Sequence, residues 1–367
     1  MDLAEIVVGV EAAAADLIDS QIDVKYRYMD NSAQGTIEEL KLKITQAKLP
    51  QEISDKLLNL LKFPGSGVEL EKTIAYINFV LSLPFDKYAE DILDINRAKQ
   101  ILDKNHFGLQ SVKDRILEYL SVLILHKQKG QTNSFHAPIL AFIGLVGTGK
   151  TSLTSSIAES LGRPIVRIPF GGLGDPATLR GQSRQKDGES GQIMKAIKLS
   201  KVSNPVILLD EIDRVAVEYR TDLMGVLVEL LDPAQNQAFV DHFLDFPYDL
   251  SQVLFIATAN NTTNIATAVM DRLEPIAMPS YTDEEKLTIG RAYLLPKAMD
   301  GAGLDRGVLI IDDLTWPQII RPLGFDAGIR SLQRTIQGIC RKVARKIVEG
   351  EKGPFKISQE NLGEYLS

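Results

Sequence analysis

The sequence is poor in the residues that build disulfide frameworks and metal centres. Its 367 residues include one cysteine, Cys340, and four histidines. A single cysteine excludes an internal disulfide and any multi-cysteine metal site. The scattered histidines lack the His-Glu-x-x-His spacing of a zinc site. We therefore expect the chemistry of this chain to come from other side chains.

Long apolar runs are also missing. No stretch approaches the 18 apolar residues that span a bilayer, so we expect no contact with a membrane. The amino-terminal region contains Asp2, Glu5 and Glu11 and has no basic residue before Lys25, unlike a secretion signal. We expect a cytoplasmic protein, or a protein of the mitochondrial matrix if the source is a eukaryote, although no transit peptide is visible.

An excess of positive charge is absent as well. The 41 basic and 48 acidic residues give a net charge of −7, and 44% of the residues are hydrophobic. The acidic balance argues against an electrostatic nucleic-acid binder. The hydrophobic content argues against disorder along the whole chain. At roughly 150 residues per domain, the length predicts two or three domains.

The pattern of apolar residues divides the chain into three parts. Residues 1–90 are predicted to be helical, residues 91–280 alternate short apolar runs with helical patterns, and residues 281–367 return to helices. The alternation predicts an α/β core with a parallel sheet covered on both faces. The five predicted strands are 138–144, 164–169, 205–210, 252–259 and 275–279.

The helical parts carry their own signals. Ile37, Leu40 and Ile44 follow the spacing of one helix face in the first part. In the last part, Thr282 precedes three acidic residues and is predicted to cap a helix. Residues 329–347 combine an apolar face with a basic face, which is typical of an amphipathic helix. We interpret this last part as a helical lid after the α/β core.

The strongest motif is GLVGTGKT at 144–151, which matches Gly-x4-Gly-Lys-Thr and lies between a predicted strand and a predicted helix. Backbone amides in such a loop bind phosphate groups. We expect Lys150 to reach the β- and γ-phosphates of ATP and the Thr151 hydroxyl to ligate Mg²⁺. The alternative is a glycine-rich turn without a ligand. The predicted nucleotide-binding residues of the loop are Gly144, Val146, Gly147, Thr148, Gly149, Lys150, Thr151 and Ser152.

A second motif, VILLDEID, places two carboxylates at the end of a buried strand. Ligands of open α/β sheets bind at this edge. We expect Asp210 to hold Mg²⁺, directly or through water, and Glu211 to act as the general base on the attacking water. The alternative is that the acidic pair only caps a helix.

Three further residues are candidates for catalysis. Asn260 follows the strand at 252–259 and could orient water or contact the γ-phosphate, or it could simply be a turn residue. Arg272 and Arg330 could neutralise charge in a phosphoryl-transfer transition state or remain solvated surface charges. Ser190 lies in KDGESG, a segment similar to that of a Ser–Lys protease nucleophile, but we expect no catalysis there.

With these motifs in place, the sequence resembles the ATPase module of Lon-type ATP-dependent proteases, which belong to the AAA+ superfamily. The resemblance runs from about Thr36 to the carboxyl end. It is carried by ILDKNHFGLQSVKDRILEYL, FGGLGDPATLRGQ, ELLDPAQNQAFVDHFLDFPYDLS, YTDEEKLTIGRAYLLPK and AGIRSLQRTI.

The resemblance implies roles for the three uncertain residues. Asn260 would be the first sensor, Arg272 an arginine finger that reaches the neighbouring subunit's nucleotide, and Arg330 a second sensor that also contacts the nucleotide. These roles imply a homohexameric ring with ATP and Mg²⁺ at each subunit boundary. Such a ring would unfold misfolded proteins and thread them into a protease chamber.

The sequence departs from the family in three ways. It ends at ENLGEYLS with no Ser–Lys protease domain, so we expect no peptide-bond cleavage by this chain, and the protease domain would be missing or separate. We expect the β-rich amino-terminal substrate domain to be missing as well, with only its helical tail present. Lys186 and Asp187 stand where family members carry an aromatic–aliphatic pair that grips the threaded chain, while Tyr219 is a candidate for a second grip.

Two other functions stay open at this point. The chain could be a stand-alone AAA+ remodelling ATPase, which need not thread substrates. It could also be a DNA-associated motor or regulator, since the basic face of residues 334–346 is a local exception to the acidic charge.

Overall fold

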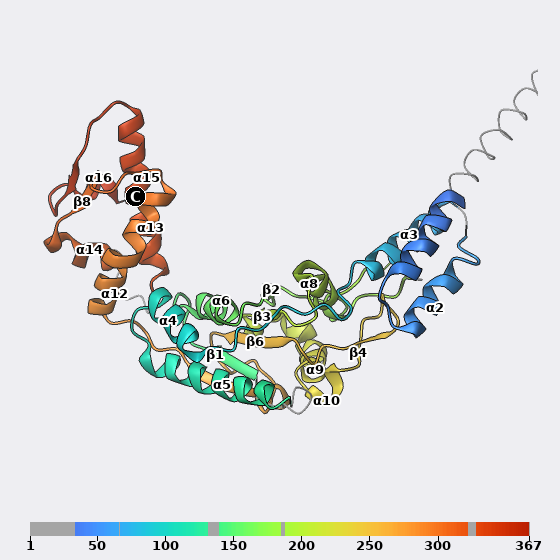
Figure 1. Cartoon of the computed structure of the whole chain (residues 1–367). Coiled ribbons are helices and arrows are strands. Elements are labelled where there is room, and N and C mark those ends of the chain that lie inside the picture. The colour runs from blue at the N-terminus through green and yellow to red at the C-terminus, as the bar shows by residue number, and fades with distance from the viewer. Residues whose placement is uncertain (1–33, 66, 131–138, 185–187, 322–327, 367) are drawn as a thin grey trace, which may run out of the picture. The chain divides into compact units, whose positions relative to one another are not determined.

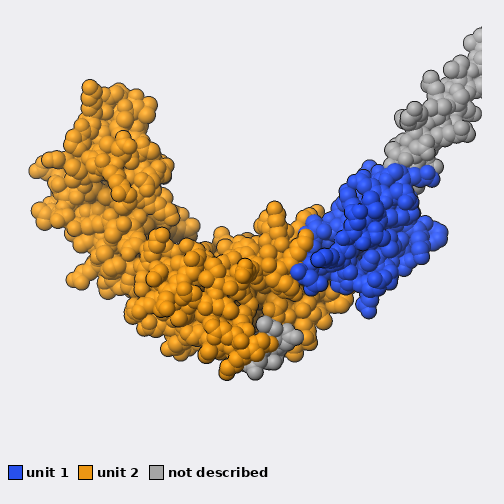
Figure 2. Space-filling view, in the orientation of Figure 1, with its two compact units in different colours: residues 1–86 blue, residues 87–367 orange. Residues whose placement is uncertain are grey.

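The computed structural model describes residues 34–65, 67–130, 139–184, 188–321 and 328–366 (Figure 1). The chain forms two compact units, residues 1–86 and residues 87–367 (Figure 2). Among the helices of the described ranges, none is long and apolar enough to cross a membrane.

The first unit is helical in its described part. It contains a helix at 34–46, then α2 (Gln51–Leu60) and α3 (Val68–Leu81). The helix predicted from the spacing of Leu40 and Ile44 is thereby confirmed, because both side chains are buried. Residues 1–33, also predicted to be helical, lie outside the described residues. Buried apolar side chains come from all three helices and include Leu40, Ile44, Leu57, Ile77 and Val80.

The second unit is built on a parallel sheet of five strands in the order β2-β3-β6-β1-β7. All five predicted strands are confirmed. The last strand starts two residues earlier than expected, because it pairs with β1 from Leu273 opposite Ile139 onward. The strands are β1 (Ile139–Ile143), β2 (Ile165–Pro169), β3 (Val206–Asp210), β6 (Leu254–Ala259) and β7 (Leu273–Ala277).

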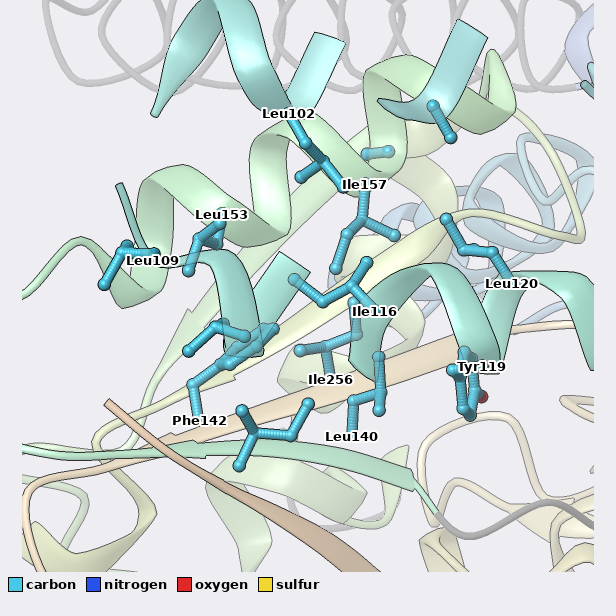
Figure 3. Packing of buried hydrophobic residues seen from close by; sticks show 14 of the residues in the cluster. Leu102, Leu109, Ile116, Tyr119, Leu120, Leu140, Phe142, Leu153, Ile157 and Ile256 are labelled. Carbon is cyan, nitrogen blue, oxygen red and sulfur yellow. The ribbon is translucent and has the colours of Figure 1, made fainter. Parts of the chain in front are cut away.

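The central strands are buried on both faces. Every residue of β3 and of β6 is buried, as expected for a covered parallel sheet. On one face, α4 (Ile95–Asn105), α5 (Gln110–Gln128) and α6 (Lys150–Leu161) form a shared apolar core with the strands (Figure 3). This core fixes α6, and therefore the loop that precedes it, above the end of β1. Its labelled members are Leu102, Leu109, Ile116, Tyr119, Leu120, Leu140, Phe142, Leu153, Ile157 and Ile256.

Short elements connect the strands. A two-stranded antiparallel hairpin of β4 and β5 follows α9. The hairpin was not predicted, because strands of two residues are too short to show an apolar period. The connecting elements are α7 (Ala177–Arg180), α8 (Gln192–Ser200), η3 (Ile212–Arg214), η4 (Val217–Tyr219), α9 (Arg220–Leu230), α10 (Pro233–Asn236), β4 (Phe239–Val240), β5 (Pro247–Tyr248) and α11 (Thr267–Met270).

The last part of the second unit is mainly helical and has its own apolar core around Trp316, Ile336 and Val343. Thr282 forms the predicted cap, with a reciprocal hydrogen bond to Glu285. Two short strands in this part, β8 and β9, pair in parallel. The elements are α12 (Asp283–Ile289), the π-helical turn η5 (Gly290–Leu294), α13 (Leu295–Gly301), β8 (Leu309–Ile311), η6 (Asp313–Thr315), α14 (Trp316–Ile320), α15 (Arg330–Val348), β9 (Phe355–Ile357) and α16 (Leu362–Tyr365).

Candidate active site

The loop between β1 and α6 has a conformation that requires glycine. Gly147 and Gly149 have φ angles of 86° and 95°, in the left-handed region that favours glycine. A Cβ atom on Gly144 would lie 2.7 Å from the Met278 carbonyl oxygen, which is too close. The loop therefore keeps its backbone near both β7 and the start of α6, as a phosphate-binding loop must.

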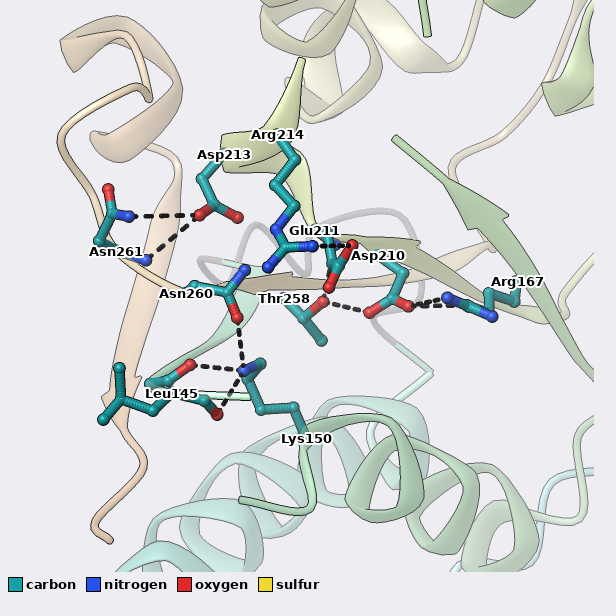
Figure 4. Close-up of polar contacts among 11 residues, drawn as sticks. Leu145, Lys150, Arg167, Asp210, Glu211, Asp213, Arg214, Thr258, Asn260 and Asn261 are labelled. Atoms are coloured by element: carbon teal, nitrogen blue, oxygen red, sulfur yellow. Dashed lines mark hydrogen bonds and ion pairs between the residues drawn. The ribbon is translucent and has the colours of Figure 1, made fainter. Parts of the chain in front are cut away.

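Lys150 is the first residue of α6, and its side chain folds back over the loop (Figure 4). Its ammonium group donates hydrogen bonds to the carbonyl oxygen of Gly144, to that of Leu145 at 3.0 Å, and to Asn260 Oδ1 at 3.2 Å. Burial lowers the pKa of Lys150, while the nearby carboxylates of Asp213 and Asp210 oppose that shift. The positive charge thus lies at the carboxyl edge of the sheet.

Asp210 ends β3 and is almost completely buried. The Thr258 hydroxyl donates a short hydrogen bond to its Oδ1 atom. The Arg167 guanidinium, from β2, donates to the Oδ2 atom with Nε at 2.7 Å. Both carboxylate oxygens therefore have partners from neighbouring strands (Figure 4). Sequence analysis missed Thr258 and Arg167.

Glu211 follows directly and has a strained backbone. Its φ angle of 58° lies in the left-handed region, which is uncommon for a residue other than glycine. Its backbone N–H donates to the Thr258 hydroxyl at 2.9 Å, so Thr258 holds both acidic residues. The Glu211 carboxylate lies 3.4 Å from Arg214 and is half-buried. Strain of this kind is frequent at active sites.

Asn260 follows the end of β6 and faces the same centre. Its Oδ1 atom accepts a hydrogen bond from Lys150. Its Nδ2 atom is buried and has no hydrogen-bond partner among the described residues. A buried amide nitrogen without a partner is costly and calls for an explanation. An anionic ligand placed beside Lys150 would supply the missing acceptor.

The hydroxyl groups at the start of α6 differ in exposure. Thr148 is buried and donates to the Leu145 carbonyl oxygen at 2.9 Å, so it shapes the loop. Ser152 is exposed and donates to the Gly149 carbonyl oxygen at 2.9 Å. Thr151 is exposed at the open end of the helix. Of the three, Thr151 fits a metal ligand best.

The lid contacts the loop at 144–151 directly. Ile329 donates its backbone N–H to the Gly147 carbonyl oxygen at 3.1 Å. A Cβ atom on Gly147 would lie 3.2 Å from the backbone nitrogen of Arg330. Tyr281 donates its hydroxyl to the Thr148 carbonyl oxygen at 3.2 Å. Arg330 therefore begins α15 beside the loop, with its side chain exposed.

Arg272 does not lie with these residues. It precedes β7, whereas the phosphate-binding loop follows β1, a parallel neighbour of β7. Its guanidinium donates to Asp232 Oδ2 at 2.9 Å and to the Ala268 carbonyl oxygen at 2.7 Å. The hydrogen bond from Arg272 lowers the pKa of Asp232. Within one chain, the structure therefore separates Arg272 from the other candidates by the length of the sheet.

A pocket of about 540 Å³ opens between α4, the start of α6 and the lid. Sequence analysis missed this pocket. The Phe107 and Tyr293 rings on its wall lie 6.5 Å apart. His106 contacts Ser156 Oγ at 2.9 Å, and burial followed by the charge of Lys113 lowers the His106 pKa to about 4. The pocket reaches the loop at Gly149.

The segment that precedes α8 is anchored by Asp241. This carboxylate has no exposed surface and accepts hydrogen bonds from the Gly191 N–H at 2.8 Å and from the Ser190 hydroxyl at 3.2 Å. Burial raises the Asp241 pKa, and the hydrogen bonds oppose the rise. Ser190 thus has a structural partner. Lys186 and Asp187 lie outside the described residues, and Tyr219 is exposed in η4.

Two family models match the chain. Residues 140–280 match the ATPase family associated with various cellular activities (AAA). Residues 300–355 match the Lon protease AAA+ ATPase lid domain. The first match covers the sheet and the phosphate-binding loop, and the second covers most of the described lid.

Curated relatives match over most of the chain. The chain is 44% identical over 340 residues to the Lon protease of Lawsonia intracellularis. This alignment covers 91% of this chain and 40% of that protein. The chain is 42% identical to the Lon protease of Heliobacterium modesticaldum, with coverages of 92% and 41%. It is 39% identical to Lon protease 2 of Thermus thermophilus, with coverages of 90% and 42%. The chain spans about two fifths of the length of these relatives.

Proposed function

We propose that this chain, which belongs to the Lon family of AAA+ proteins, binds ATP with Mg²⁺ at the loop 144–151 and hydrolyses it. One observation carries the proposal. Lys150 bonds to Asn260, and Thr258, two residues before Asn260 in the chain, bonds to Asp210 and Glu211, so the four residues gather at one edge of the sheet.

In the proposed site, the loop backbone and Lys150 bind the phosphate chain. The proposed nucleotide-binding residues in and next to the loop are Gly144, Val146, Gly147, Thr148, Gly149, Lys150, Thr151 and Ser152. Lys150 exchanges its carbonyl partners for phosphate oxygens, which are stronger acceptors because they are charged. Thr151 and Asp210 hold Mg²⁺, since hydroxyl and carboxylate oxygens are ligands that this ion prefers. The ion neutralises charge that develops on the phosphates.

Glu211 is the proposed general base. Its carboxylate accepts a proton from the attacking water, and Thr258 fixes its backbone next to Asp210. Asn260 orients that water or the γ-phosphate with its buried Nδ2 atom, while its Oδ1 atom keeps Lys150 in place. The pocket between α4 and the lid is the proposed site of the nucleoside. It adjoins the loop at Gly149, and it has aromatic walls.

We further propose that residues 91–280 are the nucleotide-binding core, residues 281–367 the lid, and residues 1–90 the helical tail of an amino-terminal domain. Arg330 contacts the nucleotide as a second sensor, because it begins α15 beside Gly147. Arg272 acts as an arginine finger on a neighbouring subunit, because it lies far from the nucleotide site of its own chain. The role of Arg272 requires a neighbouring subunit, and we propose that the subunits form a homohexameric ring.

The proposed use of ATP hydrolysis is the unfolding and threading of misfolded proteins for proteolysis by a protease domain. The relatives are named Lon proteases, and that name supports the proposal. The test is the ATPase rate of the chain with and without a permanently unfolded protein such as reduced, carboxymethylated lactalbumin. An increase of the rate with the unfolded protein but not with its folded form supports the proposal. An equal response to both forms would contradict it.

A further inference from the structure

Arg167 occupies the oxygen atom of Asp210 that the proposed Mg²⁺ site needs. The guanidinium lies on Oδ2 through Nε at 2.7 Å and through a terminal nitrogen at 2.6 Å. Oδ1 accepts the Thr258 hydroxyl. A lone pair that accepts an N–H donor cannot ligate a metal ion or its bound water at the same time.

The ion pair neutralises a buried negative charge. The Asp210 side chain is 6% exposed, and a buried carboxylate without a counter-charge is strongly destabilising. The other cations of the site have different partners: Lys150 bonds to loop carbonyl oxygens and Asn260, and Arg214 lies beside Glu211. Arg167 supplies the positive charge that Asp210 needs.

Asp210 and Arg167 differ in how freely their side chains can move. Asp210 belongs to a fully buried strand and is fixed by Thr258. Arg167 belongs to the edge strand β2, and its side chain is 57% exposed. The exposed guanidinium of Arg167 can turn into solvent and be hydrated there, whereas Asp210 is held in place. The guanidinium is therefore the partner that can leave.

We propose that Arg167 is a tethered counter-ion that Mg²⁺ displaces from Asp210, so that it sets the Mg²⁺ concentration at which the site fills. This inference rests on the proposed function. Without Mg²⁺, Arg167 stabilises Asp210. With Mg²⁺, the two cations compete for Oδ2 and repel each other, and the guanidinium moves to solvent. Arg167 acts through Asp210 and is a positioning residue.

The test is the affinity of the whole chain for Mn²⁺, a Mg²⁺ substitute, measured by electron paramagnetic resonance with a non-hydrolysable ATP analogue bound. Arg167→Gln is expected to lower the Mn²⁺ dissociation constant by roughly three- to fivefold, the range expected for a partly exposed ion pair. Arg167→Lys keeps the charge and is expected to stay within about twofold of the parent. Affinity for the analogue at saturating Mn²⁺ should not change.

Arg115→Gln is the matched control. Arg115 is 52% exposed and pairs with Glu274 at 2.7 Å, away from the loop. Its variant should bind Mn²⁺ like the parent. An unchanged or weaker Mn²⁺ affinity in Arg167→Gln, or an equal gain in Arg115→Gln, would overturn the proposal. If the parent does not bind the analogue at all, the proposed function fails, and this inference fails with it.

Discussion

Lys150 and Asn260 are joined by a hydrogen bond of 3.2 Å although they are 110 positions apart. The bond links the start of α6 to the end of β6, whose neighbour in the sheet is β1. It leaves the Asn260 Nδ2 atom buried and without a partner among the described residues. A ligand with negatively charged oxygens would satisfy this nitrogen, as the proposed function requires.

The first prediction concerns Lys150. Lys150→Ala removes the charge that the loop directs at the phosphates, and should lower nucleotide affinity at least about 100-fold, in line with the loss of several charge-assisted hydrogen bonds. Fluorescence of a labelled ATP measures the affinity. Lys99→Ala, an exposed change on α4, is the control and should bind as the parent does. Equal binding by both variants would rule out the loop as the phosphate site.

The second prediction concerns Thr258, which is fully buried and bonds to both Asp210 and Glu211. Thr258→Val removes the hydroxyl with little change of shape. It should lower the free energy of unfolding by about 1–3 kcal/mol, because polar groups are left unpaired. The rate of ATP hydrolysis should also fall at least tenfold, because an activation free energy higher by about 1.4 kcal/mol slows a reaction tenfold.

Thr315→Val is the control for Thr258→Val. Thr315 is also fully buried, but it lies in the lid and its hydroxyl faces the Ile357 carbonyl oxygen. It should lower the melting temperature without changing the hydrolysis rate of the folded protein. Similar hydrolysis rates for the two variants would show that Thr258 has a structural role only.

The third prediction concerns pH. Burial lowers the His106 pKa from 6.5 to about 4, so the folded protein keeps this ring neutral where the unfolded chain protonates it. The unfolded state then binds more protons between pH 6.5 and pH 4, and stability is lost as the pH falls through that window. The shift of about 2.5 units corresponds to a loss of at most about 3 kcal/mol.

Urea denaturation at several pH values measures this effect. The difference in unfolding free energy between pH 7 and pH 4 should be smaller in His106→Gln than in the parent. His242→Gln changes an exposed histidine and should keep the parent's pH dependence. The same slope in His106→Gln and the parent would show that His106 does not titrate in this way.

The fourth prediction concerns Arg272. If it acts on a neighbouring subunit, Arg272→Ala should bind ATP normally and hydrolyse it at least about 100-fold more slowly, because a transition-state charge is no longer neutralised. Mixing it with Lys150→Ala should restore part of the activity, since some interfaces then combine an intact pocket with an intact finger. Asp232→Asn is the control, because it removes the partner of Arg272 and keeps the arginine. Full activity of Arg272→Ala would contradict the proposal.

The sheet was predictable because each strand is a short, continuous apolar run. Parallel strands buried on both faces leave this pattern, and their carboxyl ends then place Asp210 and Asn260 at the same edge of the sheet. The lid helix α15 was predictable for a similar reason, since its buried residues follow the helical period.

Thr258 and Arg167 were not predictable from the pattern. Thr258 is β-branched, so the sequence pattern predicts only an ordinary strand residue at this position. Its role depends on the placement of β6 beside β3, which brings its hydroxyl to Asp210. In the sequence, Arg167 has the position of a solvent-facing residue in an alternating strand. Its contact with Asp210 arises because β2 pairs with β3 and not with β1. Strand order is set by the whole fold, so local sequence does not reveal it.

The hydrolysis rate and nucleotide affinity of Glu211→Gln, measured on one preparation, test the central claim most directly. Removing the base should slow hydrolysis by about 10²–10⁴-fold, while ATP affinity stays near that of the parent, because glutamine keeps the size and polarity of the side chain. Glu218→Gln, an exposed change in η4, should leave both quantities unchanged. Hydrolysis by Glu211→Gln at the parent rate would contradict the assignment of the general base.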